Sequence, residues 1–152
     1  MIVVVAAIIE RGDRRILIGQ RRRDDTSPLK WEFPGGKVRP GETPEAALAR
    51  ELSEELSVAL RKCVELGRVR HRYITFPEAL EIRFFAATIH ETEVTPKVFE
   101  QIAWVLPREL SDYDFLAANT SLIAQLATGR LKPAELLESA GSPSAPIKRD
   151  PG

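Results

Sequence analysis

Residues 36–58 read GKVRPGETPEAALARELSEELSV, and this stretch carries more structural information than any other part of the sequence. From Thr43 onward it predicts a helix, because Thr43 can cap the first turn and Pro44 fits the first helical position. The helix should end near residue 56 or 57. At about 100° per residue, three glutamates then share one side of it: Glu51, Glu54 and Glu55.

A stripe of leucines lies next to these glutamates and should face the core: Leu48, Leu52 and Leu56. Three carboxylates held together repel one another, and a hard cation with oxygen ligands relieves that repulsion. Mg²⁺ typically takes one or two carboxylates, with waters and substrate phosphates as its other ligands. Gly35 and Gly36 allow the backbone to pass close to the helix, so that a carbonyl oxygen can join the ligands.

Arg50 can contact Glu54 one turn further along the helix, or Glu42 across the preceding turn. Either contact would orient a carboxylate, as the outer partners of metal ligands do. The segment ELSEEL alone is also typical of a solvated, glutamate-rich helix face. The wider spacing favours a functional site over that alternative.

That spacing resembles the Nudix box: Gly36, Glu42, Arg50-Glu51-Leu52, Glu54-Glu55 and the apolar Val58. Ser57 departs from the pattern, because the family usually has a glycine there. Such a glycine ends the helix with a positive φ, which serine adopts less easily. The substitution touches no ligand.

The segment WEFPGGK at residues 31–37 is similar to the lead-in of the MutT-like branch, which includes 8-oxo-dGTP diphosphatases and CTP pyrophosphohydrolases. The resemblance implies the Nudix α/β/α sandwich, an α/β fold with a mixed β-sheet between helices. It also implies an Mg²⁺-dependent enzyme, with Mn²⁺ as an alternative ion. Members cut a nucleoside triphosphate between the α and β phosphates and release a monophosphate and pyrophosphate.

The resemblance also assigns roles to residues. Glu54 and Glu55 would be metal ligands, and Glu51 a ligand or the base that activates water. The carbonyl group of Gly36 would complete the metal site, and Arg50 would orient the catalytic glutamates. Lys37 would lie near the phosphates. Glu100 resembles a further glutamate that binds the metal in many members. Alternatively, Glu100 is an ordinary surface residue at the start of a strand.

The segment FLAAN at residues 115–119 resembles the one with which MutT-like proteins contact the base. Because an amide offers both a donor and an acceptor, Asn119 can read a purine edge and favours 8-oxo-dGTP. Its alternative is to cap a helix at residues 120–127. Phe33 could stack on a base or belong to the core.

Arg21 stands where the family has an arginine that can reach the base, and it is also a candidate phosphate-binding residue. The run Arg21-Arg22-Arg23 can equally be a solvated stretch or a patch that steers phosphate. Neither histidine has a partner at metal-ligand spacing, so His71 and His90 receive no catalytic role.

The rest of the chain predicts strands and helices around this segment. Strands are expected at residues 2–9, 15–20, 60–73, 80–90 and 101–106, and helices at 117–127 and 132–138. The first two strands could form a hairpin across a turn at residues 11–13. Leu80, Ile82 and Phe84 should share one face of their strand, and Phe85 breaks that alternation.

Length and composition bound the function. The 152 residues suit one Nudix domain at residues 1–130, followed at 131–152 by a short helix and a mobile Pro/Ser-rich tail. A net charge of zero argues against a basic nucleic-acid-binding face. The single cysteine, Cys63, permits a reducing compartment. We expect a cytoplasmic protein with a small-molecule nucleotide substrate and no nucleic-acid or membrane partner; nothing indicates an oligomeric state.

The box handles only the diphosphate, so other substrates remain open: CTP or 5-methyl-dCTP, a dinucleoside polyphosphate, or ADP-ribose. A non-catalytic Nudix-like binding module is the alternative from another functional class. Such modules usually lose glutamates of the box, and this sequence retains them all.

Overall fold

The computed structural model describes residues 1–140 except Tyr73, residues 75–76 and residue 92. The predicted extension of a strand to Tyr73 and the tail from residue 141 lie outside the described part. The strands are β1 (Ile2–Ile9), β2 (Ile16–Gln20), β3 (Trp31–Glu32), β4 (Gly35–Lys37), β5 (Leu60–His71), β6 (Leu80–Ile89) and β7 (Gln101–Val105). The helices are α1 (Pro44–Leu56), α2 (Thr120–Ala127), α3 (Pro133–Ala140) and the 3₁₀ helices η1 (Pro107–Asp112) and η2 (Ala117–Asn119).

The strands form two sheets. The larger has the order β4-β1-β6-β5, and it is mixed because β1 and β6 are parallel whereas the other pairs are antiparallel. The smaller, of order β3-β2-β7, is antiparallel. The predicted mixed sheet is confirmed, and the second sheet is an addition that the sequence patterns did not indicate.

The predicted hairpin of β1 with β2 is wrong. The turn itself forms, since the Arg11 N–H donates to the Arg15 carbonyl over 2.8 Å. Beyond it, one isolated bridge joins Glu10 to Ile16, and the two strands then enter different sheets. On one edge β1 pairs with β6 along its whole length, and on the other edge β4 pairs with Val4, Val5 and Ala6.

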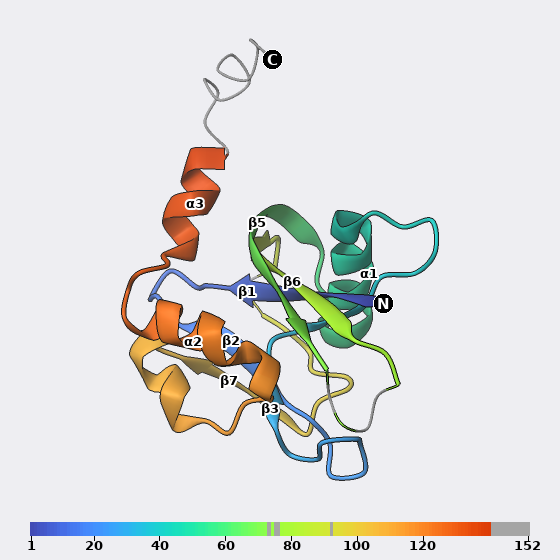
Figure 1. Ribbon diagram of the computed structural model, residues 1–152. Helices are drawn as coiled ribbons and strands as arrows, with labels where there is room; N and C mark the ends of the chain where they lie inside the picture. Colours follow the sequence, from blue (N-terminus) through green and yellow to red (C-terminus); the bar gives the residue numbers. More distant parts are fainter. Residues whose placement is uncertain (73, 75–76, 92, 141–152) are drawn as a thin grey trace.

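Helices cover both faces of the larger sheet, as an α/β/α sandwich requires (Figure 1). On one face, α1 buries its three leucines completely against residues that include Val5, Ala7 and Phe85. On the other face, α2 packs Leu122, Ile123 and Leu126 into a cluster that contains Ile8 and Phe84. The leucine stripe predicted for α1 is therefore confirmed.

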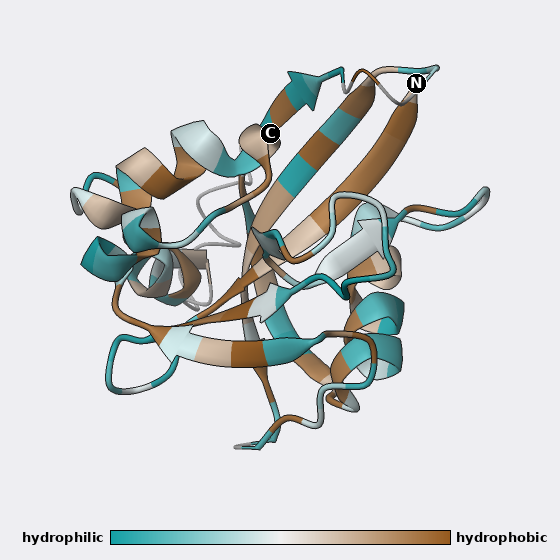
Figure 2. Ribbon diagram, turned by 90° about the horizontal axis from the view of Figure 1, so that it is seen from below, coloured by the Kyte–Doolittle hydropathy of each residue, from teal (hydrophilic) through white to brown (hydrophobic). Residues whose placement is uncertain are grey.

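Phe84 and Phe85 are both buried, in different clusters, because successive residues of a strand point to opposite faces. The prediction that Phe85 breaks the alternation of apolar and polar residues is therefore confirmed, because Phe85 is buried on the face that also carries Glu81 and Arg83. β1 is hydrophobic along nearly its whole length in Figure 2, as expected for a central strand covered on both sides.

The helix predicted at residues 132–138 is confirmed by α3, which contacts β5 and β6 and buries Leu137. A division of the chain at residue 130 remains a prediction. Within the described residues, no helix is long and apolar enough to cross a membrane.

Candidate active site

Both ends of α1 follow local rules. The Ala46 N–H donates to the Thr43 hydroxyl over 3.0 Å, and Pro44 takes the first helical position. At the other end, Ser57 adopts the left-handed conformation, with φ 58° and ψ 41°, and its N–H donates to the Ser53 carbonyl. Serine therefore closes the helix in the conformation that glycine favours.

The two glycines of β4 bring the backbone against α1. A Cβ atom on Gly36 would overlap the carboxyl group of Glu51, and one on Gly35 would overlap the carbonyl of Val5. The Gly35 N–H donates to Glu55 over 3.0 Å. A side chain at either position would therefore disturb the approach that places the Gly36 carbonyl beside the carboxylates.

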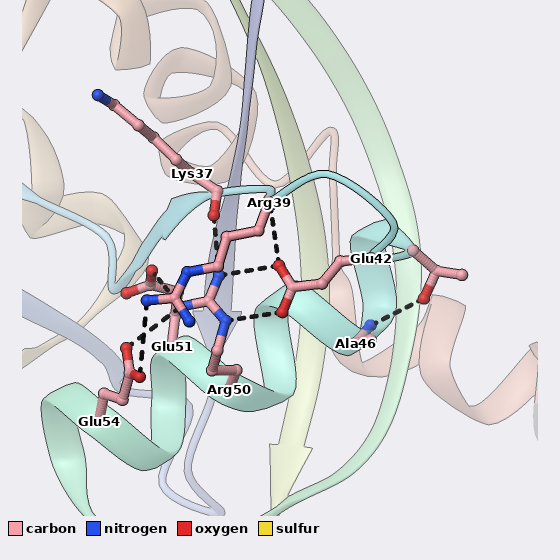
Figure 3. Close-up of polar contacts among 8 residues, drawn as sticks. Lys37, Arg39, Glu42, Ala46, Arg50, Glu51 and Glu54 are labelled. Carbon is pink, nitrogen blue, oxygen red and sulfur yellow. Dashed lines mark hydrogen bonds and ion pairs between the residues drawn. The ribbon is translucent and has the colours of Figure 1, made fainter.

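Arg50 holds the acidic residues of α1 in place (Figure 3). It donates two hydrogen bonds to Glu42, of 2.7 Å and 2.9 Å. It also donates to Glu51 over 2.9 Å and to Glu54 over 3.2 Å. A further bond of 2.9 Å reaches the Lys37 carbonyl. Both contacts that the sequence offered as alternatives, to Glu42 and to Glu54, form together.

The pKa values of these carboxyl groups are shifted in opposite directions. Hydrogen bonds from the Arg50 guanidinium and, to a smaller extent, from the Arg39 backbone N–H lower the pKa of Glu42 to about 2. Burial is the main cause that raises the pKa of Glu55 to about 8; the Gly35 N–H opposes it, and the carboxylates of Glu32, Glu51 and Glu54 add to it. A cation next to Glu55 would offset this cost of burying its charge.

The carboxylates line a cavity of about 650 Å³, a size that suits a nucleotide-sized ligand. Its wall includes Gly36, Lys37, Glu51, Glu54 and Glu55 from β4 and α1. It also includes Phe33, Leu80, Leu116 and Asn119. One cavity thus joins an acidic wall to an apolar wall with a single amide.

The donor set at the acidic wall fits a divalent cation such as Mg²⁺. Among the described residues, no three acidic, histidine or cysteine side chains converge into a ready-made metal cage. Mg²⁺ does not require one, since it binds through one or two carboxylates, waters and substrate phosphates. The carboxylates of Glu51, Glu54 and Glu55 and the Gly36 carbonyl supply oxygen donors of that kind.

Asn119 is 6% exposed and lines the cavity. Its side chain makes no capping bond to α2, because its backbone (φ −90°, ψ −5°) is helical and not in the extended conformation typical of a cap. Its amide instead donates to the Leu116 carbonyl over 3.3 Å. The capping alternative is therefore wrong, and a base-reading role remains a prediction.

The core role of Phe33 is confirmed, and its stacking on a base remains a prediction. Phe33 is buried in the core cluster, its ring centroid lies 5.2 Å from that of Phe115, and it also lines the cavity.

Arg21 lines the cavity too, but its guanidinium is engaged. It pairs with Glu32 over 3.0 Å and donates to the Thr26 carbonyl and hydroxyl over 2.7 Å and 2.8 Å. Burial raises the pKa of Glu32, and Arg21 opposes that effect. These contacts organise the loop at residues 21–30 and leave less of Arg21 for a phosphate. Sequence reasoning missed Glu32, although it adjoins Phe33 in the WEFPGGK segment.

The next two arginines fasten the same loop to the segment before β7. Arg22 donates to the carbonyls of Lys97 and Val98 over 2.9 Å and 3.1 Å, so it is not part of a purely solvated run. Arg23 pairs with Glu100 over 3.0 Å and lowers the pKa of that carboxyl group. Glu100 is not among the residues that line the cavity, which include Glu32, Glu51, Glu54 and Glu55, and its metal-binding role remains a prediction.

Comparisons with known proteins agree with this geometry. The NUDIX domain family matches residues 1–138. A putative 8-oxo-dGTP diphosphatase 2 of Mycobacterium tuberculosis is 37% identical over 125 residues, which are 82% of this chain and 87% of that protein. The CTP pyrophosphohydrolase of Escherichia coli K12 is 35% identical over 144 residues, 89% of this chain and 98% of its own.

Solved structures agree as well. A MutT structure from work on Aliivibrio salmonicida and Vibrio cholerae has a TM-score of 0.72 and 29% identity, and the match covers 84% of this chain and 98% of that one. Nudix hydrolases generally need a divalent metal ion, and the acidic wall offers oxygen donors of the kind that such an ion takes. The chain therefore belongs to the Nudix hydrolase family, in its MutT-like branch.

Proposed function

We propose that this Nudix hydrolase uses Mg²⁺ to cleave nucleoside triphosphates between the α and β phosphates, and that 8-oxo-dGTP is its favoured substrate. The products are a nucleoside monophosphate and pyrophosphate. One observation carries the proposal: a single cavity joins the carboxylates of α1 to the buried amide of Asn119. Relatives named 8-oxo-dGTP diphosphatase support the same substrate.

The bound cation neutralises phosphate charge and lowers the pKa of water. Glu54, Glu55 and the Gly36 carbonyl would hold the ion, with Mn²⁺ as an alternative to Mg²⁺. Glu51, fixed by Arg50 over 2.9 Å, binds the metal or accepts the proton of the attacking water. Lys37 is exposed at the cavity and offers its ammonium group to the phosphates.

Asn119 supports the choice of base. An amide presents a donor and an acceptor side by side, as a purine edge does. Because the group is buried, a base that fails to pair with it leaves polar atoms unsatisfied, which costs about 1–3 kcal/mol. An oxidised guanine differs from guanine in its hydrogen-bonding edge, so this amide can separate the two.

The test is hydrolysis in the presence of Mg²⁺, with every product including pyrophosphate identified, across 8-oxo-dGTP, dGTP, CTP, 5-methyl-dCTP, ADP-ribose and diadenosine tetraphosphate. We expect the highest kcat/KM for 8-oxo-dGTP, with the monophosphate as the second product. Turnover of all the triphosphates at similar rates would remove the proposed base selectivity.

A cytidine nucleotide is the second candidate substrate. It is favoured by the similarity to the CTP pyrophosphohydrolase, which this chain matches over nearly the whole length of that protein. A highest kcat/KM for CTP or 5-methyl-dCTP would support this candidate and keep the metal chemistry unchanged.

A non-catalytic binding module is disfavoured, because the glutamates of the box are present and three of them are held by Arg50. Mg²⁺ titration of the free protein separates the two classes. The enzyme should bind the ion, whereas a module that has lost its chemistry should bind it weakly or not at all.

A further inference from the structure

The two arginines near the acidic wall are used very differently. Arg50 has a side chain 17% exposed and donates to three glutamates. Arg39 has a side chain 61% exposed, and its guanidinium lies 4.0 Å from Glu54, at the limit of an ion pair. An exposed pair of that length contributes about 0–1 kcal/mol to stability, so folding does not explain Arg39.

The backbone of Arg39 is nevertheless fixed. Its N–H donates to Glu42 over 2.9 Å, and its carbonyl accepts from the Glu42 N–H over 3.0 Å. Arg50 grips the same Glu42 carboxylate, so one group anchors both arginines. The Arg39 side chain therefore extends from a defined point at the start of α1, and its guanidinium is available to solvent.

The Arg39 side chain points toward the acidic wall. Val38 is half-buried, whereas Lys37 and Arg39 on either side of it are exposed, as expected for alternating residues of an extended segment. Figure 3 shows Arg39 reaching from this segment toward Glu54. Glu54 lines the cavity and Arg39 does not, so Arg39 lies just outside the acidic wall.

In the proposed function, a nucleotide with its base near Asn119 and its scissile phosphates at Glu51 and Glu54 would carry its remaining phosphates past Glu54, at the rim of the cavity. That region holds Arg39. A guanidinium matches phosphate oxygens with a planar fork of donors and stays charged at any working pH. When Glu54 holds a cation, its weak pair with Arg39 is given up, and the guanidinium is free to bind an anion.

We propose that Arg39, beside Glu54 at the outer edge of the cavity, binds the terminal phosphates of the substrate and so favours triphosphates over diphosphates. This inference rests on the proposed function and adds a binding site for the pyrophosphate group that leaves.

The test is calorimetric titration with magnesium pyrophosphate, which is independent of the base. Three variants are compared with the wild type: Arg39→Gln, Arg39→Lys and, as a matched control, Arg108→Gln. Arg108 is an exposed arginine on η1 that does not line the cavity. We expect Arg39→Gln to raise the Kd for pyrophosphate about tenfold, Arg39→Lys to raise it less, and Arg108→Gln to leave it unchanged.

A second titration, with dGMP, should give the same Kd for the wild type and Arg39→Gln, since a monophosphate does not reach Arg39. In kinetics, kcat/KM for the preferred triphosphate should fall about tenfold in Arg39→Gln, and kcat/KM for the matching diphosphate should change less than about twofold. The melting temperature should stay within about 2 °C of the wild type.

Unchanged pyrophosphate affinity in Arg39→Gln would overturn the inference, as would an equal loss for pyrophosphate and dGMP. A wild type that hydrolyses triphosphates but does not bind pyrophosphate would also overturn it. By contrast, a wild type that hydrolyses none of the nucleotides would contradict the proposed function itself, which the panel of substrates reveals separately.

Discussion

Arg50 does more than any other single side chain to arrange the acidic wall. Its two bonds to Glu42 fix the plane of the guanidinium, and the remaining donors then place Glu51 and Glu54. A lysine carries the same charge but cannot reproduce this planar fork. The site thus depends on the geometry of one guanidinium as much as on the acidity of α1.

Glu54→Gln tests the metal assignment at the same scale. Glu54 is 52% exposed and its pairs to Arg50 and Arg39 lie on the surface, so the melting temperature should change by less than about 2 °C. Because the variant removes a charge from the proposed cation site, kcat should fall at least about 100-fold. The exposed Glu45→Gln on the same helix is the control and should retain full activity. Near-normal turnover by a folded Glu54→Gln protein would refute the assignment.

Asn119→Ala tests the reading of the base. The change removes a 3.3 Å hydrogen bond to Leu116 and should cost only about 1 kcal/mol of stability. The ratio of kcat/KM for 8-oxo-dGTP to that for dGTP should fall at least about tenfold. Gln125→Ala, an exposed change on α2, should leave the ratio intact. If Asn119→Ala keeps the selectivity, another group reads the base.

At the scale of elements, α1 and β4 form the site together. α1 supplies the carboxylates, and β4 supplies a backbone close enough to bond to Glu55. Capping and the buried leucines fix the rotation of α1 about its axis. Gly35 and Gly36, which have no side chain, allow the backbone of β4 to lie close to α1. Adding a glycine at the end of α1 and replacing the glycines of β4 test the two elements separately.

Ser57→Gly should stabilise the protein, because a glycine occupies the left-handed conformation without the strain that a Cβ brings. We expect a gain of about 1 kcal/mol in the free energy of unfolding and a melting temperature about 2–4 °C higher. The matched Ser53→Gly, inside the same helix, should lower stability by about 0.5 kcal/mol. A loss of stability in Ser57→Gly would mean that its hydroxyl contributes more than its backbone costs.

Gly36→Ala and Gly35→Ala should separate activity from stability. At Gly36 the new methyl group meets the flexible carboxyl end of Glu51, so activity should fall about 10–100-fold while the fold persists. At Gly35 it meets the backbone of Val5, which cannot move as easily, and unfolding should become easier by about 1–3 kcal/mol. Thermal melts and kcat/KM are measured for both variants. If the two variants lost stability and activity to the same extent, this prediction would be wrong.

The sequence predicted α1 well because its determinants are local: a cap at Thr43, a proline after it and leucines at helical spacing. The pairing of β1 could not be predicted the same way, because its neighbours β4 and β6 come from distant parts of the chain. The pair of Arg23 with Glu100, 77 residues apart, was hidden for the same reason. Local patterns thus identified the candidate carboxylates. They did not reveal that Arg23 pairs with one of them, Glu100.

At the scale of the whole molecule, we expect the fold to be stable without a bound cation. Two hydrophobic clusters hold the layers together, and Arg50 and the Gly35 N–H offset part of the cost of burying Glu51 and Glu55. Removal of divalent ions with a chelator should therefore abolish turnover yet lower the melting temperature by no more than about 3 °C. Restored Mg²⁺ should restore activity. Unfolding in the chelator would show that the cation is structural.

The cavity draws its walls from opposite layers of the sandwich, with the glutamates on α1 and the amide at the start of α2. A nucleotide that touches both walls ties those layers together across the sheet. Backbone amides of α2 should then exchange with deuterated solvent more slowly in the bound state, although the phosphates lie against α1. Slower exchange confined to α1 would indicate a ligand held by its phosphates alone.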